Sequence, residues 1–183
     1  MKAVLDACVL YPTVMREMLL GAARAGLYQP VWSARLLEEW ALTGRKFGPE
    51  VEAQARGEIA LAEAAFPKAR AETRPGIEQR LWLPDPNDLH VLALAVSSSA
   101  DVIVTANAKD FPRHILAEEG LSRADPDGLL QGFTEASPQV MAGIGARVLA
   151  TARQLSGEDW TLRALMRKAR LPRTGKALER LEG

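Results

Sequence analysis

The chain has 183 residues, of which 48% are hydrophobic and 25% are charged, and its net charge is zero. These values are ordinary for a folded domain, and they exclude a disordered chain, a collagen-like chain and a disulfide scaffold. The single cysteine, Cys8, cannot form an internal disulfide, and zinc sites of the Cys₂His₂ or Cys₄ type are excluded. The longest apolar run, residues 91–96, is far shorter than the ~20 residues that span a bilayer, and no signal peptide is recognisable. We therefore expect a cytoplasmic protein with no membrane partner.

The charges are unevenly distributed along the chain. From residue 161 onward there are seven basic and two acidic residues, whereas the first 160 residues hold 16 basic and 21 acidic ones. An acidic body is compatible with a cation site, and a basic tail suits a polyanion or an acidic partner. A solvated basic helix face is an equally good interpretation of the tail.

The predicted elements alternate between strands and helices. In chain order, the first half contains a strand at 2–5, a helix at 13–25, a strand at 28–32, a helix capped by Ser33 and ended by Gly44, and a helix at 49–66. After a polar stretch at 67–80, the second half contains a buried apolar helix at 88–99, a β-branched strand at 102–104, and helices at 115–119 and 126–133. The chain beyond residue 138 is helical, with breaks near Gly157 and Pro172.

This alternation predicts an α/β fold, with a parallel sheet flanked by helices and a C-terminal helical extension. We expect one domain at residues 1–135 and a helical extension, basic at its end, at residues 136–183. Ligands of such folds bind at the carboxyl ends of the strands. Asp6 follows the first strand there, and Thr105 and Asn107 follow the strand at 102–104.

Further acidic residues accompany these strand ends. Glu39 lies on the helix opened by Ser33, Asp88 begins the buried apolar helix, and Asp110 lies in the loop after the last strand. Acids that converge without lysine or arginine repel one another, and Mg²⁺ or Mn²⁺ relieves that repulsion and activates water for phosphodiester cleavage. Each acid also has a structural alternative, as a helix or turn cap or as a surface residue. Glu38 and Glu39 cannot face the same way, so only one of them can point into a site.

Four sequence blocks, taken in order, resemble the PIN-domain family, of the kind found as VapC-type toxins in toxin–antitoxin systems. The blocks are V-L-D at 4–6, S-A-R-L-L-E-E at 33–39, D-P-N-D-L-H-V-L-A-L-A at 85–95 and A-D-V-I-V-T-A-N-A-K-D-F-P at 100–112, with a weaker match, D-P-D-G-L-L, at 125–130. The resemblance implies a three-layer α/β/α fold with an acidic pocket for Mg²⁺ or Mn²⁺. It also implies cleavage of single-stranded RNA by metal-activated water, a cognate antitoxin and a homodimer.

Position by position, the resemblance makes Asp6, Glu39 and Asp88 the catalytic acids and metal ligands. Thr105 corresponds to a hydroxyl that orients a ligand or water. The family's fourth acid often stands where this chain has Asn107, and an asparagine is a neutral and weaker metal ligand. Together with Thr105, Asn107 is also expected to orient the substrate or water. Asp110 is the candidate that replaces the missing acid as catalytic residue and metal ligand. The alternative is that a second metal ion binds only together with the substrate.

Two other hypotheses stay open. One is an inactive PIN fold that serves as an interaction module, which the asparagine at position 107 permits. The other is a nucleic-acid-binding regulator that uses the basic C-terminal helices, although the same residues could steer RNA or dock an antitoxin. His90 and His114 are interpreted as packing or surface residues, and Cys8 as a buried thiol with no partner that makes it nucleophilic.

Overall fold

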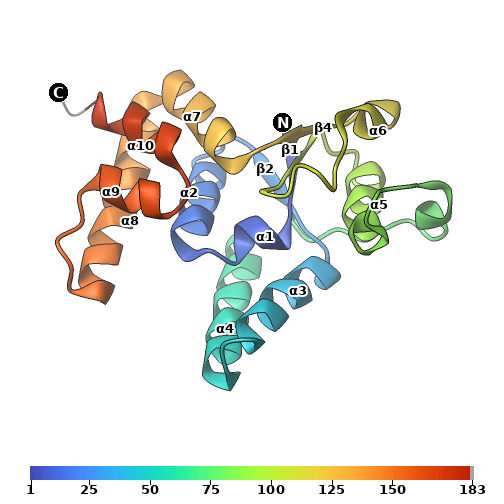
Figure 1. Cartoon of the computed structure of the whole chain (residues 1–183), viewed down its shortest axis with the longest axis horizontal. Helices are drawn as coiled ribbons and strands as arrows, with labels where there is room; N and C mark the ends of the chain where they lie inside the picture. Colours follow the sequence, from blue (N-terminus) through green and yellow to red (C-terminus); the bar gives the residue numbers. More distant parts are fainter. Residues whose placement is uncertain (182–183) are drawn as a thin grey trace. The chain divides into compact units, whose positions relative to one another are not determined.

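The computed structural model describes residues 1–181, and within them one sheet of parallel strands is surrounded by helices (Figure 1). The strand order is β2–β1–β3–β4. The strands are β1 (Lys2–Leu5), β2 (Gln29–Val31), β3 (Val102–Val104) and β4 (Ser122–Ala124). This arrangement confirms the predicted α/β class, a PIN-like fold with C-terminal helices. The edge strand β4 was not predicted, because its sequence, S-R-A, lacks β-branched residues.

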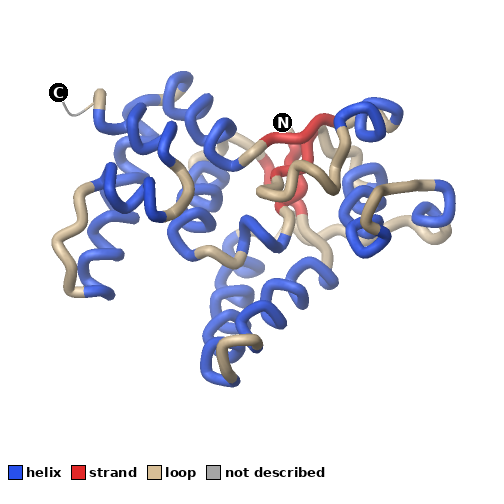
Figure 2. Tube along the Cα trace, in the orientation of Figure 1, coloured by secondary structure: helices blue, strands red, loops and turns tan. Residues whose placement is uncertain are grey.

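Helices account for most of the remaining described chain (Figure 2). The α-helices are α1 (Ala7–Leu10), α2 (Thr13–Arg24), α3 (Ala34–Arg45), α4 (Pro49–Ala65), α5 (Leu89–Ser97), α6 (Arg113–Glu118), α7 (Pro126–Ala136), α8 (Pro138–Ser156), α9 (Leu162–Lys168) and α10 (Pro172–Glu179). Two 3-10 helices, η1 (Ile77–Arg80) and η2 (Pro86–Asp88), precede α5. No helix in the described part of the chain is long and apolar enough to cross a membrane.

The central strands are buried on both faces, as expected for a parallel sheet covered by helices. Val4 pairs with Ile103 and Leu5 with Val104, and all four residues are 0% exposed. The apolar helix α5 adds buried leucines to the same core, which agrees with its predicted burial. The core therefore fixes β1 and β3 side by side, and with them the residues that follow each strand.

The α3–α4 pair shows one difference from the predicted boundaries. Ser33 caps α3 as predicted, since its side chain accepts from the Leu36 N–H at 3.2 Å. Gly44 was expected to end this helix, but α3 continues to Arg45. A Cβ at Gly44 would lie only 3.0 Å from the Val51 carbonyl oxygen, so the glycine permits the close approach of α4 instead.

The chain packs into two compact units. The first comprises residues 1–11 and 28–124 and contains the sheet, and the second comprises residues 12–27 and the described residues from 125 onward. Helix α2 packs directly on α8 in the second unit. The two helices approach so closely that a Cβ at Gly21 would lie 2.6 Å from Cγ2 of Ile144. The two packed units therefore have other boundaries than the two regions expected from the sequence, which meet at residue 135.

Candidate active site

The carboxyl ends of β1 and β3 form the candidate site in the first unit. The chain passes from β1 to β2 on one side and then to β3 on the other side of β1, so these two strands flank a topological switch point. Ligands of parallel α/β sheets bind at such points. Asp6 follows β1 and Thr105 follows β3, and the Asp6 N–H donates to the Val104 carbonyl at 3.1 Å. The sheet therefore places Asp6 and Thr105 next to each other.

The carboxylate of Asp6 is buried, with 8% of the residue exposed. Thr105 Oγ1 donates to its Oδ2 at 2.7 Å, and Cys8 Sγ donates to the same oxygen at 3.0 Å. The Cys8 N–H reaches Oδ1 at 3.5 Å, so the capping role considered as an alternative for Asp6 is present but weak. These donors are all neutral, and they orient the carboxylate without balancing its charge.

Thr105 connects Asp6 to the loop that follows β3. Its hydroxyl is buried, donates to Asp6 and accepts from the backbone N–H of Asn107 at 3.0 Å. The Nδ2 of Asn107 donates in turn to Oδ2 of Asp110. The structure thus joins the predicted residues Asp6, Thr105, Asn107 and Asp110 in one chain of hydrogen bonds.

Asp88 occupies the N-cap position of α5, but its side chain makes no capping hydrogen bond. The carboxylate of Asp85 caps the preceding 3-10 turn instead, by accepting from the Asn87 N–H at 2.9 Å. Burial, followed by the negative charges of Asp6, Asp110 and Asp85, raises the pKa of Asp88 to about 6. Asp88 therefore belongs to the same electrostatic cluster as Asp6 and Asp110.

Glu39 is half-buried and is held differently from the three aspartates. His90 Nε2 lies 2.9 Å from Oε1 of Glu39, and Arg35 Nε donates to the same oxygen at 3.4 Å. The neighbouring Glu38 faces another direction and pairs with Arg56 at 2.8 Å, as expected for adjacent residues on a helix. Only Glu39 of the two is therefore directed toward a residue of α5.

Of two further residues at the site, His90 is packed as the sequence suggested but has a polar contact, and Cys8 differs from its sequence-based interpretation. His90 is buried against Glu39. A histidine inside an otherwise apolar helix indicates that a polar partner lies nearby, because a buried polar group requires one. Cys8 is exposed instead of buried, and its thiol contacts Asp6. Although the residue is exposed, partial loss of water around its sulfur and the charge of Asp6 raise the pKa of Cys8 to about 12, which disfavours the thiolate. His114 is exposed, as expected for a surface residue.

The site offers the donor chemistry that a hard divalent cation prefers, namely carboxylate oxygens from three aspartates and the amide oxygen of Asn107. Beside burial, the negative charges of Asp6 and Asp110 contribute to the raised pKa of Asp88, and a bound cation would offset that repulsion. As the side chains stand, no three acidic, histidine or cysteine residues within residues 1–181 are grouped closely enough to hold a metal ion. The residues therefore fit a divalent cation by the chemistry of their donor atoms and not by an assembled coordination geometry.

Residues 2–109, more than half of the chain, match the sequence model of the PIN domain. The chain belongs to the PIN domain family. PIN domains are in general nucleases, so membership supports nucleic acid hydrolysis as the class of activity. The matched region contains Asp6, Glu39, Asp88, Thr105 and Asn107, and it ends one residue before Asp110. Neither the curated proteins nor the solved structures gave a match to this chain.

The weakly matching block at 125–130 lies in the second unit, where its acids have structural contacts. The buried carboxylate of Asp127 accepts from the backbone N–H groups of Arg173 and Thr174, at 2.9 and 2.8 Å. Asp125 caps α7 and also pairs with the Arg173 side chain. These two acids therefore tie the start of α7 to the start of α10.

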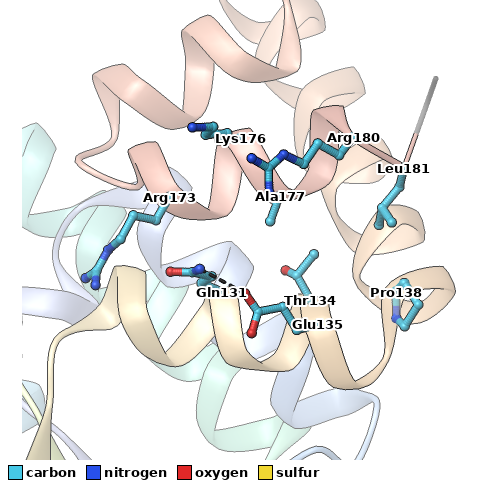
Figure 3. Close-up of a pocket in the computed structure, with 9 residues that line it drawn as sticks. All are labelled: Gln131, Thr134, Glu135, Pro138, Arg173, Lys176, Ala177, Arg180 and Leu181. Carbon is cyan, nitrogen blue, oxygen red and sulfur yellow. Dashed lines mark hydrogen bonds between the residues drawn. The ribbon is translucent and has the colours of Figure 1, made fainter.

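A groove of about 490 Å³ lies between α7 and α10 of the second unit (Figure 3). One wall carries Arg173 and Lys176 of α10 and its C-cap residue Arg180. The α7 wall carries Gln131 and Glu135, which are joined by a hydrogen bond of 2.9 Å. Lys176 and Arg180 are exposed. Part of the basic tail recognised in the sequence is thus displayed along an open groove.

Proposed function

We propose that this PIN-domain protein is a metal-dependent endoribonuclease that cleaves single-stranded RNA and uses Mg²⁺ or Mn²⁺. One observation carries the proposal: Asp6, Asp88 and Asp110 share an electrostatic cluster at the switch point of the sheet, and the pKa of Asp88 is raised to about 6. Carboxylates that repel one another without a structural cation are the groups expected to bind a divalent cation. Membership of the PIN family supports the nuclease class.

The residues of the site have distinct roles in this proposal. Asp6, Asp88, Asp110 and Glu39, with the amide oxygen of Asn107, are the groups that would hold the metal. When bound, the cation supplies an activated water and stabilises the charge that develops on the phosphoryl oxygens.

The protein itself contributes orientation. The Thr105 hydroxyl fixes one oxygen of Asp6 through a hydrogen bond of 2.7 Å, and the backbone of Asn107 fixes that hydroxyl in turn. The side chain of Asn107 holds Asp110 by the same kind of contact. Asn107 therefore organises the neighbouring acid even though it lacks a charge of its own.

The decisive experiment is cleavage of end-labelled single-stranded RNA with Mg²⁺ or Mn²⁺, for the wild type and for Asp6→Asn. Asp101→Asn is the matched control, because Asp101 is an exposed aspartate of the same unit just before β3. We expect cleavage by the wild type and the control, and none by Asp6→Asn or after addition of EDTA. Equal, metal-independent cleavage by all three proteins would contradict the proposal.

We further propose that the protein acts in the cytoplasm as the toxin of a toxin–antitoxin pair, as a homodimer that binds an antitoxin protein. The similarity of residues 4–112 to VapC-type toxins supports this assignment. Growth arrest on expression of the wild type but not of Asp6→Asn would agree with a toxin, and light scattering would measure the dimer. Undisturbed growth at full expression of an active wild type would contradict the toxin role.

A second candidate function is nucleic acid binding without cleavage. The exposed Lys176 and Arg180 on the α7–α10 groove favour it, because cationic side chains on an open surface suit a phosphate backbone. RNA binding that persists in the wild type while every metal-supplemented cleavage assay is negative would favour this candidate over the nuclease.

A further inference from the structure

His90 occupies an unusual position next to the acidic cluster. It lies on α5 two residues after Asp88, and only 4% of it is exposed. Its Nε2 lies 2.9 Å from Oε1 of Glu39, which comes from α3. The contact therefore connects the helix that carries Glu39 with the helix that Asp88 precedes as its N-cap.

The two ring nitrogens of His90 differ in their surroundings. Nε2 lies 2.9 Å from Oε1 of Glu39, and since a carboxylate oxygen only accepts hydrogen bonds, we infer that the hydrogen is on Nε2. The other nitrogen, Nδ1, is buried and has no hydrogen-bond partner within residues 1–181. In the neutral ring Nδ1 then carries a lone pair and no hydrogen, and this arrangement avoids a buried donor without an acceptor.

The contacts of Glu39 leave one of its oxygens available. Both His90 and Arg35 approach Oε1, and Arg35 does so at the longer distance of 3.4 Å from an exposed position. Oε2 has no polar contact among the described residues. A carboxylate that is fixed through one oxygen can present the other to a ligand in a defined orientation.

We propose that His90 is a positioning residue that holds Glu39 through Oε1, so that Oε2 of Glu39 is directed to the cation of the acidic site. This inference rests on the proposed metal-dependent function and adds a residue to it. Groups that orient metal ligands in this way typically change metal affinity by about 10- to 100-fold when they are removed.

The test is Mn²⁺ binding to the full chain by calorimetry, in the absence of RNA. We expect His90→Leu to weaken Mn²⁺ binding by about 10- to 100-fold. His90→Gln should restore most of the affinity, because its amide nitrogen can donate to Glu39 as Nε2 does. His114→Gln, which changes the exposed histidine, is the control and should bind like the wild type. Thermal unfolding of each variant reports loss of structure separately.

A double-variant cycle identifies the partner through which His90 acts. In a Glu39→Gln background, His90→Leu should cause no further loss of Mn²⁺ affinity, whereas independent effects would add. Unchanged affinity in folded His90→Leu, or equal losses for the leucine and glutamine variants, would overturn the inference while leaving the metal site intact. A wild type that binds no Mn²⁺ would overturn the proposed metal dependence and this inference with it.

A measurement on the wild type keeps the inference testable if His90→Leu does not fold. The chain contains two histidines, so ¹⁵N spectra of the imidazole rings are simple, and His114→Gln assigns the remaining signal to His90. We expect the tautomer with hydrogen on Nε2. Hydrogen on Nδ1 alone would show that His90 does not donate to Glu39 and would overturn the proposal.

Discussion

Asp6 in the first unit and Asp127 in the second are both buried aspartates, with 8% and 5% of each residue exposed. Asp127 is fully engaged: it accepts from two backbone N–H groups at the start of α10, from the Thr174 hydroxyl at 2.8 Å and from Nε of Arg173 at 3.2 Å. In the described part of the chain, the carboxylate of Asp6 accepts only from neutral groups of Thr105 and Cys8, and further carboxylates are its charged neighbours.

The comparison shows how a buried carboxylate can be assigned to structure or to chemistry. A cation and a helix N-terminus stabilise the charge of Asp127, so its burial contributes to holding α7 and α10 together. The charge of Asp6 is oriented but not neutralised, and Asp88 and Asp110 add to it. Asp6 therefore remains available to a ligand of positive charge, whereas Asp127 does not.

Asp6→Asn should give the largest effect on activity and a small effect on folding. Loss of the charge removes one of the proposed metal ligands, and we expect RNA cleavage to fall by at least about 10²-fold. Relief of repulsion in the acidic cluster offsets the weakened hydrogen bonds, so the thermal midpoint should change little. Parallel cleavage and thermal unfolding assays check both parts, and a large fall in the midpoint would place Asp6 in the same structural class as Asp127.

Asp127→Ala should give the opposite result. The substitution removes hydrogen bonds from a charged acceptor and leaves the first N–H groups of α10 without their partner, so we expect a loss of about 2–3 kcal/mol in the free energy of unfolding. Urea unfolding measures this loss. The cleavage rate per folded molecule should stay near that of the wild type, and a rate as low as that of Asp6→Asn would remove the distinction between the two aspartates.

The parts of the fold with strong local signals could be predicted from the sequence. The β-branched strand at 102–104 and the Ser33 cap are examples, and both are confirmed. The single turn of α1 and the strand β4 span four and three residues, too few for any periodicity to show. Short elements of this kind are decided by the neighbours on which they pack.

The candidate site likewise has a part that could be predicted from the sequence and a part that could not. Asp6 and Thr105 could be placed together because both follow parallel strands, and the carboxyl ends of such strands meet at one edge of a sheet. The contact between His90 and Glu39 could not be predicted, because it depends on which faces of α3 and α5 meet. Sequence reasoning thus located the acidic residues but not the group that holds one of them.

The pH dependence of the acidic cluster follows from the raised pKa of Asp88. Between its usual value of 3.8 and about 6 the folded protein binds more protons than the unfolded chain, so stability decreases as pH rises through this range. Asp88→Asn should therefore raise the unfolding free energy at pH 7 in EDTA, by on the order of 1 kcal/mol after solvent screening, and should give less gain at pH 4. Mn²⁺ binding by the wild type should weaken as pH falls below about 6.

Thermal unfolding in EDTA at the two pH values measures the stability effect, and calorimetry measures the binding effect. Asp85→Asn is the comparison variant, since Asp85 makes a capping hydrogen bond that the amide weakens. A fall in stability for Asp88→Asn at pH 7 would show that Asp88 is held by structural contacts as Asp127 is.

The smallest expected effect concerns the basic groove of the second unit. If Lys176 and Arg180 contact RNA phosphates, Lys176→Ala/Arg180→Ala should weaken binding of single-stranded RNA in EDTA. The slope of log Kd against log salt should decrease by about 1.4, since each phosphate contact on a single strand contributes about 0.7. Lys68→Ala/Arg147→Ala removes the same charge from exposed positions elsewhere and serves as the control. Equal slopes for the two double variants would show that RNA binding depends only on net charge. The basic side chains along the groove would then be a solvated helix face, and within residues 1–181 the acidic site would remain the one surface with a proposed function.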